Sequence, residues 1–212
     1  MNLIFMGPPG AGKGTQAEII SKKLGIPTVS TGLMLRGAVK EGTELGKIAE
    51  KCMSEGKLVP DDIIVGIIKE KLNSEELASG FILDGFPRTV AQAEALTETG
   101  TKIDKVLSLE VPDEKIVERL SSRRECSKCG VPYNVISNKP QKEGICDKCG
   151  GELIMRADDN PETIMNRLNI YHNETEPIKA YYEKLGLLVI AEGCEELDDT
   201  TKAVTTALGI EA

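Results

Sequence analysis

The chain has 212 residues, a formal net charge of −8 and 40% hydrophobic residues, with no Trp and only 3% aromatic residues. These values predict one globular domain with an aliphatic core, and the acidic balance argues against general nucleic-acid binding. No apolar run reaches the roughly 18 residues of a membrane span, and MNLIFMG lacks the features of a signal peptide, so we expect a cytoplasmic protein without a membrane segment.

Strands and helices are expected to alternate along the chain. The expected strands cover residues 3–6, 27–30, 81–84, 105–111 and 187–191. The expected helices cover 13–23, 33–55 with an interruption near Gly42, a segment beginning at Asp61, 90–96, 113–124, 161–168, 174–185 and 200–208. This alternation predicts an α/β fold with a doubly wound parallel sheet that helices cover on both faces.

The stretch GPPGAGKGT, residues 7–15, matches the phosphate-binding pattern G-x-x-x-x-G-K-[ST], with Gly14 placed before the hydroxyl residue Thr15. Glycines let backbone N–H groups point into an anion cradle, and the helix that follows presents its N-terminus to the phosphates. Lys13 is expected to reach the β and γ phosphates, and the Thr15 hydroxyl to meet Mg²⁺. Asp84, at the end of an apolar strand, is a candidate acid on the Mg²⁺ side.

A phosphate-binding loop alone does not distinguish GTPases, ATPases and kinases. A GTPase is expected to carry the guanine-reading sequence N-K-x-D, but Asn138-Lys139-Pro140-Gln141 lacks the Asp. We therefore reject the GTPase class. The only histidine, His172, is interpreted as a structural or surface residue, and its isolation disfavours a mechanism that needs a histidine base.

Four cysteines form two pairs at metal-ligand spacing, Cys126-x₂-Cys129 and Cys146-x₂-Cys149, separated by 16 residues. Each pair ends in C-x-x-C-G, where glycine permits the tight turn around a thiolate. Four soft ligands with no open position predict a structural site for Zn²⁺, with Fe²⁺, free thiols and disulfides as the alternatives. The surrounding residues 126–151 offer few large apolar side chains, so metal binding is expected to replace a core there. Cys52 and Cys194 are expected to pack as small side chains.

Three further motifs follow the loop in order: Ser30-Thr31-Gly32-x₃-Arg36, Asp84-Gly85-Phe86-Pro87-Arg88-Thr89 and Arg156-x-Asp158-Asp159-x-Pro161-Glu162. With the loop, they make the whole chain resemble adenylate kinases of the bacterial long form, whose lid carries a metal. The resemblance implies a P-loop core (residues 1–29, 60–121 and 160–212), a helical lobe for the monophosphate (30–59, the AMP lobe below) and a zinc-ribbon-like lid over ATP (122–159, the lid below). It implies transfer of the ATP γ-phosphoryl group to AMP with Mg²⁺, by a monomer with ATP, AMP and ADP as its partners.

The resemblance also implies roles for individual residues. The implied catalytic residues are Lys13, Asp84, Arg88, Arg123, Arg156 and Arg167. The implied ATP-binding residues are Gly10, Ala11, Gly12, Lys13, Gly14, Thr15, Arg119 and Arg123. The implied AMP-binding residues are Thr31, Arg36, Lys57, Val59, Gly85, Arg88, Gln92, Arg156 and Arg167, with Gln92 reading the adenine edge. Asp158 and Asp159 are expected to close the lid against arginines, and Cys126, Cys129, Cys146 and Cys149 to bind the metal.

The arginines support this reading, because the chain has only seven and six of them fall on the implied nucleotide positions. Arginine is the residue that binds phosphate through a planar fork. The seventh, Arg124, is expected on a solvated face. Leu33 departs from the family, which usually has Asp there, so we expect altered orientation of active-site arginines and a changed rate or AMP affinity in Leu33→Asp.

In-line phosphoryl transfer needs positioning and charge stabilisation rather than a protein nucleophile, and lobe closure would exclude water. Two alternatives stay open at this stage. The first is a kinase for another nucleoside monophosphate, and the second is a nucleotide-gated ATPase or a zinc-ribbon nucleic-acid-binding module.

Overall fold

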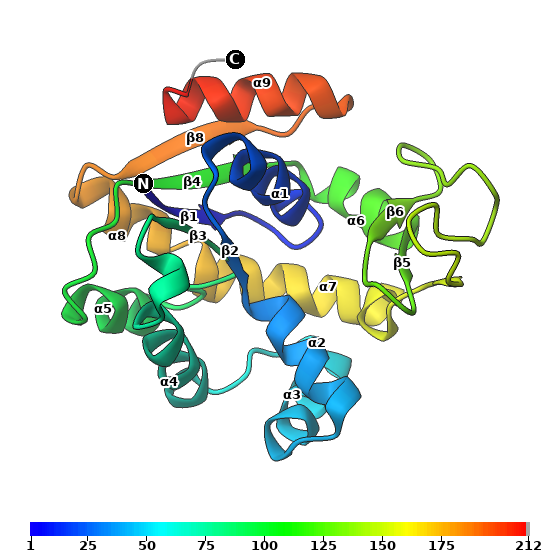
Figure 1. Ribbon diagram of the computed structural model, residues 1–212, viewed down its shortest axis with the longest axis horizontal. Coiled ribbons are helices and arrows are strands. Elements are labelled where there is room, and N and C mark those ends of the chain that lie inside the picture. The colour runs from blue at the N-terminus through cyan, green and yellow to red at the C-terminus, as the bar shows by residue number, and fades with distance from the viewer. Residues whose placement is uncertain (211–212) are drawn as a thin grey trace.

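The computed structural model describes residues 1–210 and places five strands in one parallel sheet (Figure 1). These strands are β1 (Asn2–Met6), β2 (Thr28–Ser30), β3 (Phe81–Asp84), β4 (Lys105–Glu110) and β8 (Leu188–Glu192). Their order in the sheet is β2-β3-β1-β4-β8, and every neighbouring pair runs parallel. The α/β fold with a parallel sheet is thereby confirmed.

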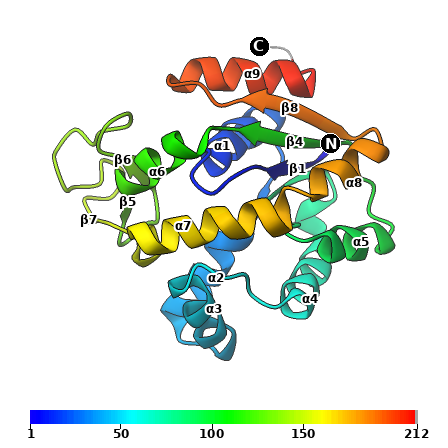
Figure 2. The same cartoon turned by 180° about the vertical axis from the view of Figure 1, so that it is seen from behind.

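Helices connect these strands and cover both faces of the sheet. They are α1 (Lys13–Leu24), α2 (Thr31–Glu41), α3 (Glu44–Ser54), α4 (Asp61–Leu72), α5 (Val90–Glu98), α6 (Asp113–Ser121), α7 (Pro161–Ile170), α8 (Ile178–Lys184) and α9 (Leu197–Leu208). Short turns of 3₁₀ helix lie at Glu75–Leu77 and Ala157–Asp159, and a π-helical turn at Tyr171–Thr175. In Figure 1 α1 lies in front of the sheet, whereas Figure 2 shows α7 and α8 on the opposite side.

Alternation of side chains along the central strand builds two separate apolar layers. Leu3 and Phe5 of β1 pack in one layer, which includes Val204 of α9. Ile4 packs in the other layer, which includes Tyr182 of α8. Because successive strand residues point to opposite faces, one continuous apolar strand can serve both layers. The strand ends that carry the predicted site residues are thus held between two buried layers.

Local sequence signals explain where several helices begin and end. The side chains of Thr43, Thr89 and Asn160 accept hydrogen bonds from the first turns of α3, α5 and α7. Gly42, with a φ of 68°, ends α2 and so confirms the expected interruption. The AMP lobe consists mainly of α2 and α3, which project from the sheet in Figure 1.

The lid departs from the expected secondary structure. The helix expected over 113–124 ends at Ser121, and β5 (Arg123–Cys126) follows it. The segment 126–151, which lies outside the expected strands and helices, contains β6 (Pro132–Asn134). Together with β7 (Leu153–Ile154), this strand flanks β5 in an antiparallel sheet. Pairing with these strands outweighs the helical pattern of residues 122–124.

Two later helices also differ from expectation. The helix expected from Glu174 begins at Ile178, since the π-helical turn at Tyr171–Thr175 precedes it and Pro177 fits only the start of a helix. The last helix begins at Leu197 rather than Thr200, with Asp198 and Asp199 in its first turn, where acidic side chains are favoured. Within residues 1–210, no helix has the length and apolar character needed to cross a bilayer.

Candidate active site

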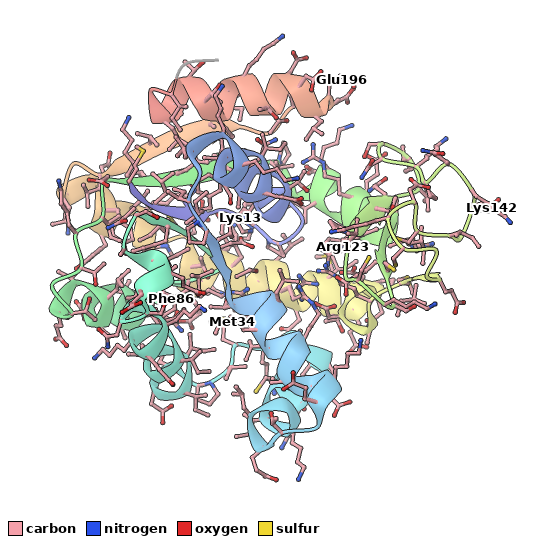
Figure 3. All side chains as sticks on the ribbon, in the orientation of Figure 1. Lys13, Met34, Phe86, Arg123, Lys142 and Glu196 are labelled. Carbon is pink, nitrogen blue, oxygen red and sulfur yellow. The ribbon has the colours of Figure 1, made fainter. Side chains whose placement is uncertain are left out.

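The predicted nucleotide-site residues gather around one cavity of about 1180 Å³ between the sheet, the AMP lobe and the lid. Figure 3 shows Lys13 near the centre of the molecule and Arg123 where the lid joins it. Of the residues expected to bind nucleotide or close the lid, all but Asp159 line this cavity: Gly10, Ala11, Gly12, Lys13, Gly14, Thr15, Thr31, Arg36, Lys57, Val59, Asp84, Gly85, Arg88, Gln92, Arg119, Arg123, Arg156, Asp158 and Arg167.

The glycine-rich loop joins β1 to α1 in the expected conformation. Gly7, Gly10 and Gly12 have φ values of 135°, 82° and 102°, a region that side chains larger than glycine rarely adopt. A Cβ atom on Gly10 would also lie 2.8 Å from the Leu120 side chain. The loop therefore needs glycine both for its backbone angles and for its packing, and it presents the N-terminus of α1 to the cavity.

Lys13 lies at the centre of this loop, and its Nζ donates hydrogen bonds to the carbonyl oxygens of Gly7 and Pro8, both at 2.8 Å. The pKa of Lys13 is lowered to about 8, chiefly by burial; Asp84 opposes this shift, and nearby arginines contribute to it. Lys13 is thus a cation that a bound polyphosphate would stabilise.

Asp84 ends β3 beside the loop, where its Oδ2 accepts a hydrogen bond from Ser30 Oγ at 3.0 Å. The same oxygen would lie 3.5 Å from a Cβ atom on Gly14, so the carboxylate faces the first turn of α1. A carboxylate at this position, with the Thr15 hydroxyl on the same cavity wall, provides the oxygen donors that suit Mg²⁺.

Gly85 allows two predicted AMP-site residues to meet. Its φ is 79°, and a Cβ atom there would lie 2.9 Å from Arg88 Nη2 and 3.0 Å from Thr31 Oγ1. The Gly85 carbonyl oxygen accepts hydrogen bonds from Thr31 Oγ1 and from Arg88 Nε, both at 2.8 Å. Thr175, in the π-helical turn, donates to the Arg88 carbonyl oxygen at 2.8 Å and fixes the backbone of Arg88 from the other side.

Gln92 is buried and its amide already has two partners. Its Nε2 donates to Asp61 Oδ1 at 2.7 Å, and its Oε1 accepts from the Arg88 backbone N–H at 2.7 Å. Asp61 is held in turn by a hydrogen bond from Thr89 Oγ1 at 2.8 Å. The amide keeps one further hydrogen and one further lone pair, so its orientation is fixed while contact with a base remains possible.

Two aspartates next to α7 hold two arginines at the cavity. Arg123 donates two hydrogen bonds to the Asp159 carboxylate, from Nε at 2.7 Å and from Nη2 at 2.6 Å. Arg167 Nη1 lies 2.9 Å from Asp158 Oδ2 and 3.1 Å from Asp159 Oδ1. Burial is the largest cause that lowers the pKa of Arg167. Asp159 thus lies behind the arginines, not on the cavity wall.

Arg36 of the AMP lobe and Arg156 of the lid approach the same carboxylate, that of Glu125. Arg156 Nη2 forms an ion pair with Glu125 Oε2, and Arg36 Nε lies 3.9 Å from that oxygen. Burial lowers the pKa of both arginines, that of Arg156 to about 10, and their mutual repulsion adds to this for Arg156. The Nε atoms of both are buried without a hydrogen-bond acceptor among the described residues, so each keeps an N–H donor for a bound anion.

Arg119 and Lys57 also line the cavity, whereas Arg124 and His172 lie outside it. Arg119 donates to the carbonyl oxygens of Ala11 at 3.2 Å and Cys194 at 2.7 Å, so it joins the glycine-rich loop to the turn before α9. Lys57 is mostly exposed and pairs with Glu55 at 2.6 Å. Arg124 does not line the cavity and donates to the carbonyl oxygens of Ser121 and Arg123. His172 is exposed, between Asp113 and Glu176, whose hydrogen bonds raise its pKa.

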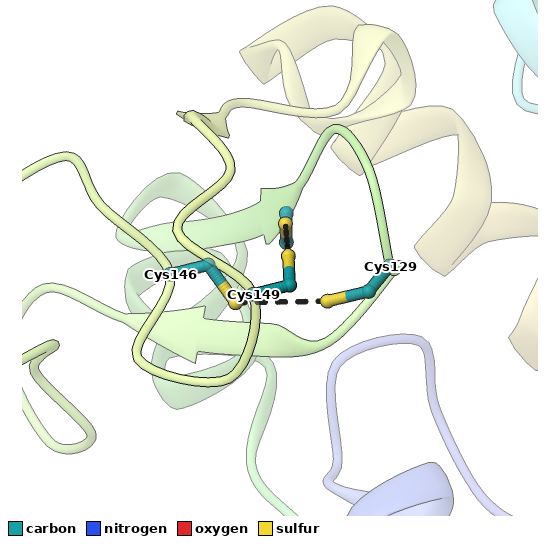
Figure 4. Close-up of side chains that lie close together, drawn as sticks. Cys129, Cys146 and Cys149 are labelled. Atoms are coloured by element: carbon teal, nitrogen blue, oxygen red, sulfur yellow. Dashed lines mark hydrogen bonds between the residues drawn. The ribbon is translucent and has the colours of Figure 1, made fainter.

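The four predicted ligand cysteines meet in the lid (Figure 4). All four sulfur atoms lie within 4.8 Å of one another, and two pairs are 3.4 and 3.6 Å apart. Tetrahedral Zn–S bonds of about 2.3 Å would place sulfurs about 3.8 Å apart, so the cluster fits a metal of that size. All six cysteines are free thiols.

The turns around the sulfurs agree with the predicted role of glycine. Gly130 and Gly150 have φ values of 70° and 68°. The backbone N–H of Cys129 hydrogen-bonds the Cys126 sulfur, which is the largest cause that lowers the pKa of that thiol. The Tyr133 hydroxyl donates to the Cys146 sulfur at 3.5 Å. These donors stabilise thiolates, the form that binds metal.

Sequence reasoning missed the residues that support those at the cavity, namely Glu125, Asp61 and Thr175. For Glu125 a signal exists, because alternation in a strand over 123–126 places it on the same face as Arg123. The expected helix through Arg124 hid that relation.

Comparisons with known proteins agree with this site. The model of the family described as adenylate kinase matches residues 5–187. The chain is 58% identical to an adenylate kinase of Caldicellulosiruptor bescii over 100% of both chains. It is 50% identical to adenylate kinases of Acetivibrio thermocellus and Archaeoglobus fulgidus, over 98% of each chain. The phosphate-binding loop, the arginines that line the cavity and these matches along the full length lead to one conclusion: the chain belongs to the adenylate kinase family.

Proposed function

We propose that this protein transfers the γ-phosphoryl group of ATP to AMP, reversibly, and forms two molecules of ADP. The observation that carries the proposal is the single cavity in which the glycine-rich loop faces arginines from α2, α6, β5 and α7 and from the segment after β3. Such a cavity suits two phosphate-bearing ligands that meet end to end. The relatives named adenylate kinase support the same reaction.

The residues divide between the two ligands according to the elements that hold them. The loop from Gly10 to Thr15, with Arg119 and Arg123, would bind the ATP phosphates and the adjoining nucleoside. The residues that would bind AMP are Thr31, Arg36, Lys57, Val59, Gly85, Arg88, Gln92, Arg156 and Arg167. Arg156 and Arg167 would also offset the charge of the phosphoryl group in transit.

The Lys13 ammonium would donate hydrogen bonds to the transferred phosphoryl group. The phosphates would then replace the carbonyl oxygens of Gly7 and Pro8 that now accept its hydrogen bonds. Mg²⁺, when bound, supplies positive charge that offsets the charge on the phosphate oxygens. Asp84 and Thr15 are the residues that would hold it. No side chain needs to accept a proton, because the AMP phosphate is itself an anionic nucleophile.

Closure of the lid would exclude water from the transferred group. Asp158 and Asp159 support this role, since they hold Arg167 and Arg123 at the point where the lid joins α7. We assign Zn²⁺ to the four-cysteine cluster, because four thiolates suit that ion and leave no open position. Metal analysis of purified protein would show one zinc per chain, whereas iron at that ratio would overturn the assignment.

We further propose that the protein acts as a monomer in the cytoplasm. The cavity takes all its lining residues from one chain, and a reduced four-thiol site suits a reducing compartment. Light scattering after gel filtration would give the mass of one chain, 22.9 kDa, across a wide range of protein concentration.

ADP formation from MgATP tests the reaction, measured with AMP, UMP, CMP, GMP or no acceptor. Fast turnover with AMP alone would support the proposal. Preference for another monophosphate would keep the transfer but overturn the assignment of the base. Hydrolysis of ATP without an acceptor would overturn the claim that the lobes exclude water.

A further inference from the structure

Glu125 is a buried acid that joins two segments expected to move separately. It belongs to β5 of the lid, and its Oε2 contacts Arg156 of the lid and Arg36 of the AMP lobe. The three side chains are 16%, 13% and 26% exposed. One carboxylate oxygen thus carries the ionic link between these two segments at this point.

The charges around Glu125 require such an acid. Arg36 and Arg156 are both buried at the cavity, and Arg123 and Arg167 lie close enough to act on the pKa of Arg36. Asp158 also acts on both arginines, but for Arg36 and Arg156 alike its effect is smaller than that of Glu125. Without Glu125, two guanidinium groups from opposite lobes would face each other with little solvent between them.

The absence of an acid at position 33 leaves Glu125 of the lid as the carboxylate that Arg36 approaches. Leu33 lies three residues before Arg36 on α2, so the two side chains are neighbours on one face of the helix. The Leu33 side chain is 55% exposed and lines the cavity, and it offers Arg36 no acceptor. An acid at position 33 would stay beside Arg36 in every arrangement of the lobes, whereas Glu125 reaches it only when the lid is near.

We propose that Glu125 is a positioning residue that orients Arg36 and Arg156 toward the AMP phosphate when the lid meets the AMP lobe. This proposal rests on the proposed function, because it assigns those two arginines to AMP. Glu125 itself touches no substrate in this scheme. It couples productive AMP binding to lid closure, because Arg36 and Arg156 reach their orientation toward the AMP phosphate only when the closed lid also excludes water.

Glu125→Gln tests the proposal, since it keeps the size of the side chain and removes its charge. We expect kcat/KM for AMP to fall about tenfold. Removing one partner of a fully buried ion pair would lower it more, but these three side chains are partly exposed to solvent. The loss should appear mainly in KM for AMP, while KM for MgATP changes less than about twofold. Glu152→Gln is the matched control, an exposed acid of the same lid that does not line the cavity, and it should change neither constant.

A second substitution provides the decisive readout. In the Glu125→Gln background, Leu33→Asp should restore most of the kcat/KM for AMP, because it places a carboxylate beside Arg36 on the same face of α2. In the wild-type background the same change should have a smaller effect, so the two positions should be strongly non-additive. Glu125→Asp, which keeps the charge on a shorter side chain, should give an intermediate value.

Two results would overturn the proposal. One is an AMP kcat/KM in Glu125→Gln within about twofold of wild type. The other is a loss that Leu33→Asp does not restore, accompanied by loss of metal from the lid, which would assign Glu125 a structural role. Turnover of the wild-type protein with AMP distinguishes both results from failure of the proposed function. If the proposed function were wrong, the wild-type protein itself would form no ADP from MgATP and AMP.

Discussion

The core and the lid of this protein are stabilised by different kinds of interaction. Two large groups of aliphatic side chains enclose the parallel sheet of the core. In the lid, the buried apolar cluster consists of Cys126, Tyr133 and Cys146, with Val131 and Leu153 packed against it. Burial of apolar surface therefore stabilises the core, whereas the proposed zinc, held by four thiolates, would stabilise the lid.

The core and the lid also contribute different residues to the cavity. The core supplies the glycine-rich loop, Asp84 and Arg88, all at the carboxyl ends of buried strands or directly after them. The lid supplies Arg123 and Arg156, which acidic side chains hold in place. In the proposed function, the core would bind the phosphates, and we expect the lid to have its own folding equilibrium and to close over them. Four experiments can test how independent the two halves are.

Removal of the lid metal should have the largest effect. Structural zinc supplies about 10 kcal/mol or more of apparent binding free energy in small zinc domains. We expect Cys146→Ser, or chelation, to unfold residues 122–159 while the core keeps its own melting transition. Calorimetry would show two transitions, and hydrogen exchange would locate the lost protection in the lid.

Cys52→Ser is the matched control for this experiment, because Cys52 is a free thiol in α3, outside the cluster. It should leave both transitions near their wild-type temperatures. Unfolding of the whole chain on chelation would contradict the comparison, since it would show that the core also depends on the metal.

Lys13→Met should have the next largest effect, on turnover and on MgATP affinity rather than on folding. Loss of one preorganised cation at the transferred group costs about 10³-fold in kcat, or about 4 kcal/mol. The stability should change little, because Lys13 is a buried cation whose charged form the fold disfavours. Turnover and urea unfolding should be measured together. Lys23→Met, an exposed lysine of the same helix, should leave both unchanged.

Leu107→Ala should destabilise the core by about 3 kcal/mol, since it removes a fully buried side chain from β4. Urea unfolding should report this loss in the core transition, while metal affinity of the lid stays the same. Ile190→Ala on the neighbouring strand β8 is the control: that side chain is 58% exposed, and its loss should cost less than about 0.5 kcal/mol. A weaker lid in Leu107→Ala would show coupling between the halves.

The smallest effect should be a dependence of MgATP affinity on pH. The pKa of Lys13 in the free protein is about 8, so this lysine is charged below that pH and loses its proton above it. Phosphate binds the charged form, so binding must take up a proton above pH 8 and should weaken by up to about tenfold per pH unit. Titration calorimetry in buffers of different ionisation enthalpy would measure that uptake. Lys13→Arg should bind with no such dependence, because its guanidinium keeps its proton.

The core could be predicted from sequence because its signals are local. The apolar run of β1, the glycines of the loop and the caps of several helices each determine structure within a few residues. The site residues that follow β1, β2 and β3 lie in short motifs at the ends of predicted strands. The others that line the cavity, such as Arg119 and Arg167, were assigned only through the family resemblance.

The partners of those residues could not be predicted, because pairing depends on tertiary distance. Arg123 and Arg124 were expected at the end of a helix, but with Glu125 they belong to a strand that pairs with β6 and β7. Because of that error, the contacts of the Glu125 carboxylate with Arg36 and Arg156 were not predicted. Asp61 and Thr175 were missed in a similar way, since nothing near them in sequence indicates Gln92 or Arg88 as a partner.

The lid begins and ends at neighbouring points of the fold. Its first strand β5 pairs antiparallel with its last strand β7, where Glu125 lies opposite Ile154, and Asp159 at its end binds Arg123 at its beginning. An insertion whose two ends meet places little constraint on its host. The lid therefore has the geometry of an insertion that we expect could be exchanged for another of the same end-to-end spacing without rebuilding the phosphate-binding loop.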